Sequence, residues 1–406
     1  MRVSSNQTQL MAINSMLDQQ AKLSTAQQQV ATGKKIFKPS DDPVGASRIV
    51  NLKDTVHVTK QYQSNIESAR SHLTTEEGSL AGAVDVMQRA RELAIEGNNA
   101  SQTNETRSYI AEEIDQLGKE LLGLANTTDS SGKFLFAGSK STLRPFARNE
   151  QGAFEYNGDD TQRYIQIGPK RRIATNDSGT DTFRSIREGN GSFVALDYKN
   201  NKGSGVIDPG TISGNYDQQT YAIVFDRKQA AHNPNEPVTY SVINTKGEQV
   251  VKPTVYVEGN AIEFKGIHTF VKGEPKAGDF FVIRPSYSQD AFTTLDNFSK
   301  ALRESRGTPA ELANLHNEMN RVITNIDQGL GRLLEVRANV GARLNVMDSQ
   351  EKINEAYKVQ IKELLSNAED LDYGEAVSRL NLKLTGLEAS QKAFTRVQGI
   401  SLFNYL

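Results

Sequence analysis

The sequence contains neither cysteine nor tryptophan among its 406 residues. Without cysteine the chain can form no disulfide, and it has no thiolate to serve as a nucleophile or as a metal ligand. No run of eighteen apolar residues occurs, so we expect no transmembrane helix. Residues 1–6 (MRVSSN) lack the basic start and the apolar stretch of a secretory signal peptide, so we expect no cleaved signal of that kind.

An excess of charge of either sign is also missing. The chain has 47 Lys and Arg residues against 49 Asp and Glu residues, which gives a formal net charge of −2. Nothing therefore indicates an electrostatic affinity for nucleic acid or for an anionic membrane. The basic run at residues 170–172 would suit a phosphate contact, but three charges beside a strand are more typical of a solvated sheet edge.

Proline is scarce in both flanks of the chain. Eight of the eleven prolines lie between residues 141 and 289, together with seventeen of the twenty-nine Phe and Tyr residues. Because proline interrupts helices, this distribution predicts long helices in the flanks around a turn-rich, β-rich middle. Alternating runs in the middle predict strands at 154–156, 164–167, 221–225, 239–243, 254–257, 261–264, 267–271 and 280–283. Gly259-Asn260 and Thr245-Lys246-Gly247 are hairpin signals.

The flanks carry apolar residues in heptad spacing. From Tyr62 to Ala94 apolar or small residues recur in steps of four and three, and Glu76 is the single exception. The same spacing occurs at 312–326 and at 373–387. A stripe that repeats every 3.5 residues is buried only against another long helix, in the same chain or in a neighbouring molecule. The flanks are therefore predicted to form a coiled-coil bundle.

The helix boundaries follow from caps and breakers. We expect helices at about 5–31, 43–96, 104–126, 309–365 and 372–403, with a further helix from about Ser288. Gly33 is the predicted C-cap of the first helix. Asp42 is the predicted N-cap of the second, with Pro43 at its first helical position. A short strand is predicted at 134–137.

Together these patterns predict an α+β protein, an elongated helical coiled-coil bundle built from both flanks with an inserted β-rich domain. The predicted division has a terminal assembly helix and loop at 1–43 and a discontinuous helical rod at 44–140 and 290–369. The β-rich outer domain occupies 141–289, and a C-terminal assembly helix occupies 370–406.

The sequence offers no recognisable catalytic, cofactor or metal site. Its five histidines are scattered, and no paired metal-ligand spacing occurs. Asp159-Asp160 and Asp177…Asp181 lie in turn-rich segments where Asp usually forms Asx-turns; a weak calcium loop would need a fuller ligand set. Gly189-Asn190-Gly191 lacks the Lys-Ser/Thr continuation of a phosphate loop. We therefore predict that the protein is not an enzyme and needs no cofactor.

Several motifs carry a resemblance to a known family. They are MRVSSNQTQL at the start, DDPVGASRIVNL at 41–52, ARELAIEGNN at 90–99, KFLFAG at 133–138, EVRANVGARLNVMD at 335–348 and QGISLFNYL at the end. In this order they resemble the flagellar hook-associated protein 3 family, the hook–filament junction proteins of the flagellin superfamily. Flagellin, the filament subunit, is the neighbouring alternative. The MRVS opening, the Asp41-Asp42-Pro43 turn and the SLFNYL ending favour the junction family.

The resemblance implies a structural adaptor of the bacterial flagellum, located outside the cell. Such a protein is exported by the flagellar type III apparatus after a cytosolic chaperone has held its C-terminal region. It forms a homo-oligomeric ring that contacts hook-associated protein 1 on one side and flagellin on the other, and it is a monomer when isolated. The alternative from another class is a binding module displayed on a helical stalk.

The terminal stripes are the candidate assembly contacts. They have no obvious place in the bundle, so we expect both ends to be disordered in the monomer and to pair on assembly. The alternative is that they fold back as ordinary bundle core. The candidate contact residues are Leu10, Ile13, Leu17, Leu380, Leu384, Leu387, Phe394, Leu402 and Phe403. The acidic pair Asp41-Asp42 could contact a neighbouring subunit, but helix capping accounts for Asp42 fully.

Overall fold

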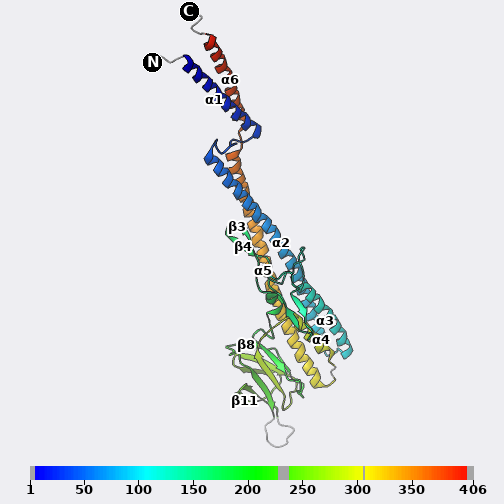
Figure 1. Cartoon of the computed structure of the whole chain (residues 1–406). Helices are drawn as coiled ribbons and strands as arrows, with labels where there is room; N and C mark the ends of the chain where they lie inside the picture. The colour runs from blue at the N-terminus through cyan, green and yellow to red at the C-terminus, as the bar shows by residue number, and fades with distance from the viewer. Residues whose placement is uncertain (1–4, 227–236, 305–306, 400–406) are drawn as a thin grey trace, which may run out of the picture. The chain divides into compact units, whose positions relative to one another are not determined.

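The computed structural model describes residues 5–226, 237–304 and 307–399. In chain order, long helices precede and follow a β-rich middle, which confirms the predicted fold class (Figure 1). The helices are α1 (Ser5–Thr32), α2 (Pro43–Gly97), α3 (Asn104–Ala125), α4 (Ala291–Arg303), α5 (Pro309–Glu369) and α6 (Tyr373–Gly399). Their limits agree closely with the predicted ones, because caps and breakers at the helix ends are local signals.

The strands between α3 and α4 are short. They are β1 (Phe146–Arg148), β2 (Phe154–Tyr156), β3 (Tyr164–Gly168), β4 (Arg171–Ala174), β5 (Ile186–Arg187), β6 (Phe193–Asp197), β7 (Val206–Ile207), β8 (Thr211–Ile212), β9 (Tyr221–Asp226), β10 (Thr239–Asn244), β11 (Gln249–Val255), β12 (Ala261–Phe264), β13 (Ile267–Lys272), β14 (Phe280–Pro285) and β15 (Ser288–Gln289). A single turn of π-helix, η1 (Thr180–Arg184), precedes β5.

The chain divides into two compact units. Unit 1 comprises Met1–Ile66, Ile167–Pro169 and Asp348–Leu406, and unit 2 comprises Glu67–Gln166 and Lys170–Met347. Helices α2 and α5 therefore contribute residues to both units. The finer predicted division, with boundaries near residues 43, 140, 290 and 369, stays a prediction.

In unit 1, α1 and α6 pack against each other along a heptad seam. Lys383 Nζ donates a hydrogen bond to the Lys22 carbonyl at 3.2 Å, and Ser390 Oγ donates one to Gln19 Oε1 at 3.1 Å. The seam residues are buried or half-buried: Ala12, Met16, Gln19, Leu23, Ala26 and Val30 on α1, and Ala376, Leu380, Lys383, Leu387, Ser390 and Phe394 on α6. The spacing of four and three on both helices is that of a two-stranded coiled coil.

Two short connectors join this helix pair to the rest of unit 1. The Leu371 amide donates to the Gly33 carbonyl at 2.9 Å, and the Lys35 amide donates to the Glu369 carbonyl at 2.7 Å. Gly33 has φ +67° and ends α1, as predicted; a Cβ at this position would lie 2.7 Å from the Tyr373 hydroxyl. The left-handed conformation and the close approach both require glycine.

Unit 2 contains the helical core. The heptad residues of α2 between Leu73 and Met87 are fully buried, as are those of α5 between Leu315 and Ile326. Ion pairs link these two helices, with Arg91 Nε 2.6 Å from Asp327 Oδ1 and Arg337 2.7 Å from Glu77. Helices α3 and α4 also pack together. The predicted burial of these stripes within one chain is thus confirmed.

The β strands of unit 2 form two main sheets around one apolar core. The larger sheet has the order β11-β10-β9-β14-β6, and the smaller one β12-β13-β7. Fully buried Phe193, Ile223, Phe225 and Ile283 belong to the core between them. Asparagines of α5 anchor this domain: Asn317 accepts from the Ile207 amide at 2.8 Å and donates to the Gly205 carbonyl at 3.1 Å.

Two local predictions were wrong. The predicted strand 134–137 is a turn with one isolated bridge, Thr128–Phe134, because its apolar residues are buried against neighbouring aromatic rings instead of pairing as a strand. The hairpin predicted at Gly259-Asn260 joins two strands that do not pair. The paired strands β12 and β13 are instead connected by Lys265-Gly266, both with positive φ, as the tight turn requires.

Candidate assembly surface

The α1–α6 pair of unit 1 leaves apolar side chains exposed outside its seam. Leu10, Ile13 and Leu17 recur in steps of three and four on α1, and Tyr373, Val377 and Leu384 recur in steps of four and seven on α6, so each set lies on one side of its helix; together they are called the exposed apolar face. Leu382, which is 71% exposed, lies on another side of α6. The large apolar side chains that remain exposed on the two helices are Leu10, Met11, Ile13, Leu17, Tyr373, Val377, Leu382 and Leu384. A contiguous exposed apolar surface of this kind marks a site of interaction.

The predicted contact residues separate into two groups. Leu380, Leu387 and Phe394 are half-buried in the seam against α1. Leu10, Ile13, Leu17 and Leu384 are exposed. Leu402 and Phe403 lie outside the described residues. Leu382 was missed by the sequence reasoning because it does not fall on the heptad step.

The interior of the helix pair is thin. Among its described side chains only Leu23, Ala26 and Ala376 are buried. Ordering one residue costs roughly 1–2 kcal/mol of backbone entropy, and burying one large apolar side chain returns only about 1.5–3 kcal/mol. Two helices of 28 and 27 residues therefore gain too little from this seam alone. We therefore expect further apolar contacts to stabilise the pair.

Both carboxylates of the loop before α2 accept hydrogen bonds from nearby backbone amides. Asp42 Oδ1 accepts a hydrogen bond from the Gly45 amide at 2.9 Å, and the Asp42 carbonyl accepts from the Ala46 amide. Asp41 Oδ2 accepts from the Lys38 amide at 2.9 Å. Pro43 opens the helix, where its missing N–H is not needed. This is the geometry of an N-cap, and it supports the capping interpretation over a contact with a neighbour.

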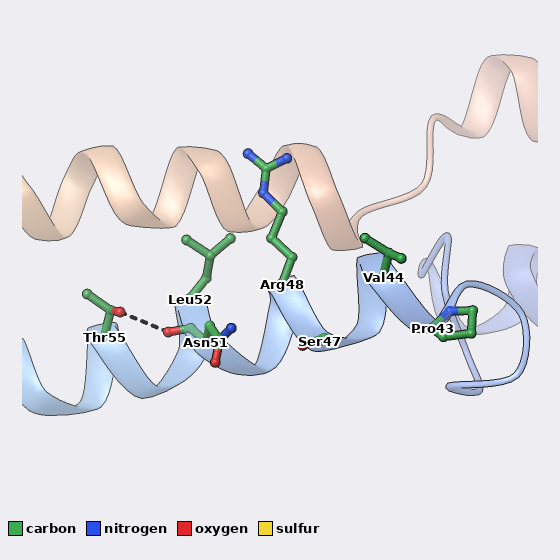
Figure 2. Close-up of a pocket in the computed structure, with 7 residues that line it drawn as sticks. All are labelled: Pro43, Val44, Ser47, Arg48, Asn51, Leu52 and Thr55. Carbon is green, nitrogen blue, oxygen red and sulfur yellow. Dashed lines mark hydrogen bonds between the residues drawn. The ribbon is translucent and has the colours of Figure 1, made fainter.

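A groove of about 520 Å³ runs along the start of α2 in unit 1 (Figure 2). Val44, Arg48 and Leu52 point to one side of the helix in this view. The complete lining is Pro43, Val44, Ser47, Arg48, Asn51, Leu52 and Thr55. Val44 is 81% exposed. Val44 and Leu52 give the groove an apolar part, beside the guanidinium group of Arg48 and the polar side chains of Ser47, Asn51 and Thr55.

The polar residues considered above as metal or phosphate ligands mostly make hydrogen bonds within the fold. Asp159 accepts hydrogen bonds from the Ser139 hydroxyl and from the Ser139 and Thr161 amides, as expected of a turn residue, and these bonds hold its pKa well below the usual range. His316 Nδ1 lies 2.6 Å from Asn98 Oδ1, and burial lowers the pKa of His316. Lys170, Arg171 and Arg172 are exposed around the β3–β4 turn.

Within the described ranges, no three His, Asp or Glu side chains come together as a metal site. His232 lies outside those ranges. In the same part of the chain, every helix is too short or too polar to cross a membrane.

Known proteins are similar to this chain over nearly all of it. The bacterial flagellin N-terminal helical region matches residues 3–141, and the bacterial flagellin C-terminal helical region matches residues 323–406. The flagellar hook-associated protein 3 of Salmonella typhimurium is 23% identical over 403 residues, which cover 99% of both chains.

Two solved structures from Legionella pneumophila are also similar. The flagellar hook-associated protein 3 is 32% identical with a TM-score of 0.75, and the match covers 79% of this chain and 98% of that one. The flagellar junction protein FlgL is 31% identical with a TM-score of 0.72, and the match covers 80% of this chain and 100% of that one.

Proposed function

The chain belongs to the flagellar hook-associated protein 3 family, the junction proteins of the flagellin superfamily, and we propose that it forms a ring of identical subunits between hook-associated protein 1 and flagellin. Its role is structural, at the hook–filament junction. The flagellin alternative fits less well, because the two Legionella pneumophila proteins, which are 32% and 31% identical and are matched over 98% and 100% of their own length, are a hook-associated protein 3 and a junction protein.

The observation that carries the ring proposal is the exposed apolar face of the α1–α6 pair. In a ring, that face would be covered by the same helices of neighbouring subunits. A closed ring repeats one heterologous contact, so one exposed face and one complementary face per subunit are sufficient. Burial of Leu10, Leu17 and Leu384 would then supply the apolar contacts that the pair lacks in the monomer.

The proposal extends to export and localisation. The protein leaves the cell through the flagellar type III apparatus and works outside it as a scaffold without catalytic activity. A cytosolic chaperone covers the apolar face of the C-terminal helix before export, which prevents premature association. The exposed side chains of Tyr373, Val377 and Leu384 suit such a partner, because their spacing places them on one side of α6.

Substitutions that introduce a charge on the exposed apolar face test the proposed assembly surface. Leu10→Asp and Leu384→Asp place a carboxylate on the apolar face without entering the seam, so the helix content measured by circular dichroism should be unchanged. Assembly of the purified protein into oligomers in the presence of hook-associated protein 1, measured by sedimentation velocity, should fall at least tenfold. The matched control is Val255→Asp on β11, a residue 51% exposed in unit 2, which should associate like the unmodified protein.

Normal association of both the α1 and the α6 variants would contradict the proposed assembly surface but leave the family assignment intact.

Limited proteolysis of the isolated monomer tests separately whether the seam between α1 and α6 is too small to keep the two helices folded. We expect early loss of roughly forty residues from each end, because a marginal helix pair opens often. Resistant termini would show that the pair is stable without neighbours.

A further inference from the structure

Glu76 is a carboxyl group in the middle of an apolar stripe. It lies on α2 between Leu73 and Leu80, and all three side chains have no exposed surface. Glu76 Oε1 accepts a hydrogen bond from the Asp177 amide at 3.0 Å. Glu76 Oε2 is buried and has no hydrogen-bond partner. An ionised carboxylate in this position would carry charge on an oxygen that neither water nor protein stabilises.

The nearest basic group does not neutralise Glu76, because it is already paired. Arg343 on α5 makes two hydrogen bonds to the Asp177 carboxylate, at 2.6 and 3.0 Å, and Gln162 donates a third to the same group. Glu76 therefore faces a second carboxylate. Burial, followed by the charge of Asp177, raises the pKa of Glu76 to about 8.

The other charged groups on this part of α2 are occupied elsewhere. Glu77 pairs with Arg337 at 2.7 Å. His72, one turn earlier, lies 3.5 Å from Asp129. Arg337 and His72 thus have carboxylate partners of their own. The charges that act on Glu76 are Asp177, which raises its pKa, and Arg343, whose smaller effect lowers it.

Asp177 belongs to a largely buried segment that runs from Asn176 through η1, in which Asp181 and Arg184 are exposed. Asn176, Ser178 and Phe183 are buried, and the Gly179 amide donates to the Phe136 carbonyl at 2.9 Å. The hydrogen bond from the Asp177 amide to Glu76 fastens the start of this segment to α2. Any change that expels the Glu76 side chain toward water therefore has to break this attachment.

We propose that Glu76 is a proton-dependent lock, which in its neutral form holds segment 176–184 against α2 and which releases the segment when the carboxyl group ionises. The direction of the pH dependence follows from the pKa of Glu76 in the open and in the closed segment. In the open segment Glu76 is solvated and has its ordinary pKa of 4.5, whereas in the closed segment the pKa is raised. The closed state thus binds the proton more tightly and is fully favoured below pH 4.5. Its advantage declines as pH rises to about 8 and is then constant.

The lock makes a quantitative prediction for amide exchange. Between the two pKa values the opening constant of the segment should rise about tenfold per pH unit, since opening releases one proton. Hydrogen–deuterium exchange of the full chain at pH 6, 7 and 8, corrected for intrinsic exchange, measures this slope in peptides that cover residues 176–184. The expected rise from pH 6 to 8 is about 50-fold, because the slope flattens as the pH approaches the pKa of the closed state, about 8.

Glu76→Gln keeps an acceptor for the Asp177 amide and cannot titrate, so its slope should be zero. Glu76→Met, which suits the apolar stripe and also cannot titrate, provides the same test if the amide variant folds poorly. The matched control Glu77→Gln removes the adjacent, partly exposed carboxylate and should retain the slope of the unmodified protein. A flat profile in the unmodified protein, or an equal slope in the Glu76 variants, would overturn the proposal.

Discussion

Glu369 is the strongest candidate for a single residue that holds the terminal helix pair to the rest of unit 1. Its side chain is only 10% exposed, and Oε1 lies 2.6 Å from Lys34 Nζ and 2.8 Å from Lys53 Nζ. Its carbonyl accepts the hydrogen bond from the Lys35 amide. Glu369→Gln removes the charge, retains the shape of the side chain and leaves two lysines facing a neutral amide.

The stability that Glu369→Gln is expected to lose can be estimated from the exposure of the two lysines. Lys34 and Lys53 are 48% and 43% exposed, so each ion pair is screened and contributes about 0.2–1 kcal/mol. The two share one largely buried oxygen, which places the sum at about 1–2 kcal/mol near pH 7. Hydrogen bonds from Lys34 and then Lys53 lower the pKa of Glu369. The stabilisation is therefore complete above the ordinary pKa of 4.5 and is lost as pH falls through the lowered value.

Local hydrogen exchange is the suitable assay, because the Lys35 and Leu371 amides lie in the two connectors. Their opening free energy should fall by the stated amount in Glu369→Gln at pH 7 and should no longer differ from the unmodified protein at pH 2. A double-mutant cycle with Lys53→Met isolates one pair and should give a coupling of about 0.5 kcal/mol. A coupling of zero, with an equal effect of the glutamine variant at pH 2 and pH 7, would refute the electrostatic reasoning.

Three further substitutions test particular contacts by thermal unfolding and exchange. Asp42→Ala should cost about 1 kcal/mol at the start of α2, whereas Asn or Ser at this position should be tolerated, since either can accept the same amide hydrogen bond. Gly138→Ala should cost more than about 2 kcal/mol, because φ is +65° and a Cβ would collide with the Asp159 carbonyl. Its control, Gly132→Ala, has φ +77° and open space and should cost only about 1 kcal/mol. Asn317→Ala should cost about 2–3 kcal/mol, since it leaves a buried amide and a buried carbonyl without partners.

The helical flanks were predictable from local signals in the sequence. Heptad spacing, proline distribution and caps such as Gly33 and Asp42 act within a few residues, so the helix limits follow without knowledge of the partner. The strands with clear alternation were also found. The error at Gly259-Asn260 has a different origin: a turn signal shows where the chain can turn, but the pairing of β12 with β13 depends on the whole sheet.

The apolar stripes of the terminal helices were visible in the sequence, but their division into two faces was not. Leu380 and Leu384 lie on the same predicted stripe, yet one is half-buried against α1 and the other is exposed. The difference arises from the relative rotation of α1 and α6, which no local pattern specifies.

The sequence by itself determined the family, the helical flanks, the β-rich insert and the single polar residue, Glu76, in a stripe of apolar ones. Only the tertiary structure decided what that residue meets. Asp177 follows it by 101 positions and Arg343 by far more, and they are brought to one buried point by the packing of a loop and α5 against α2. Local chemistry acts over a few residues of chain, whereas the environment of a buried charge is created by segments that are distant in sequence.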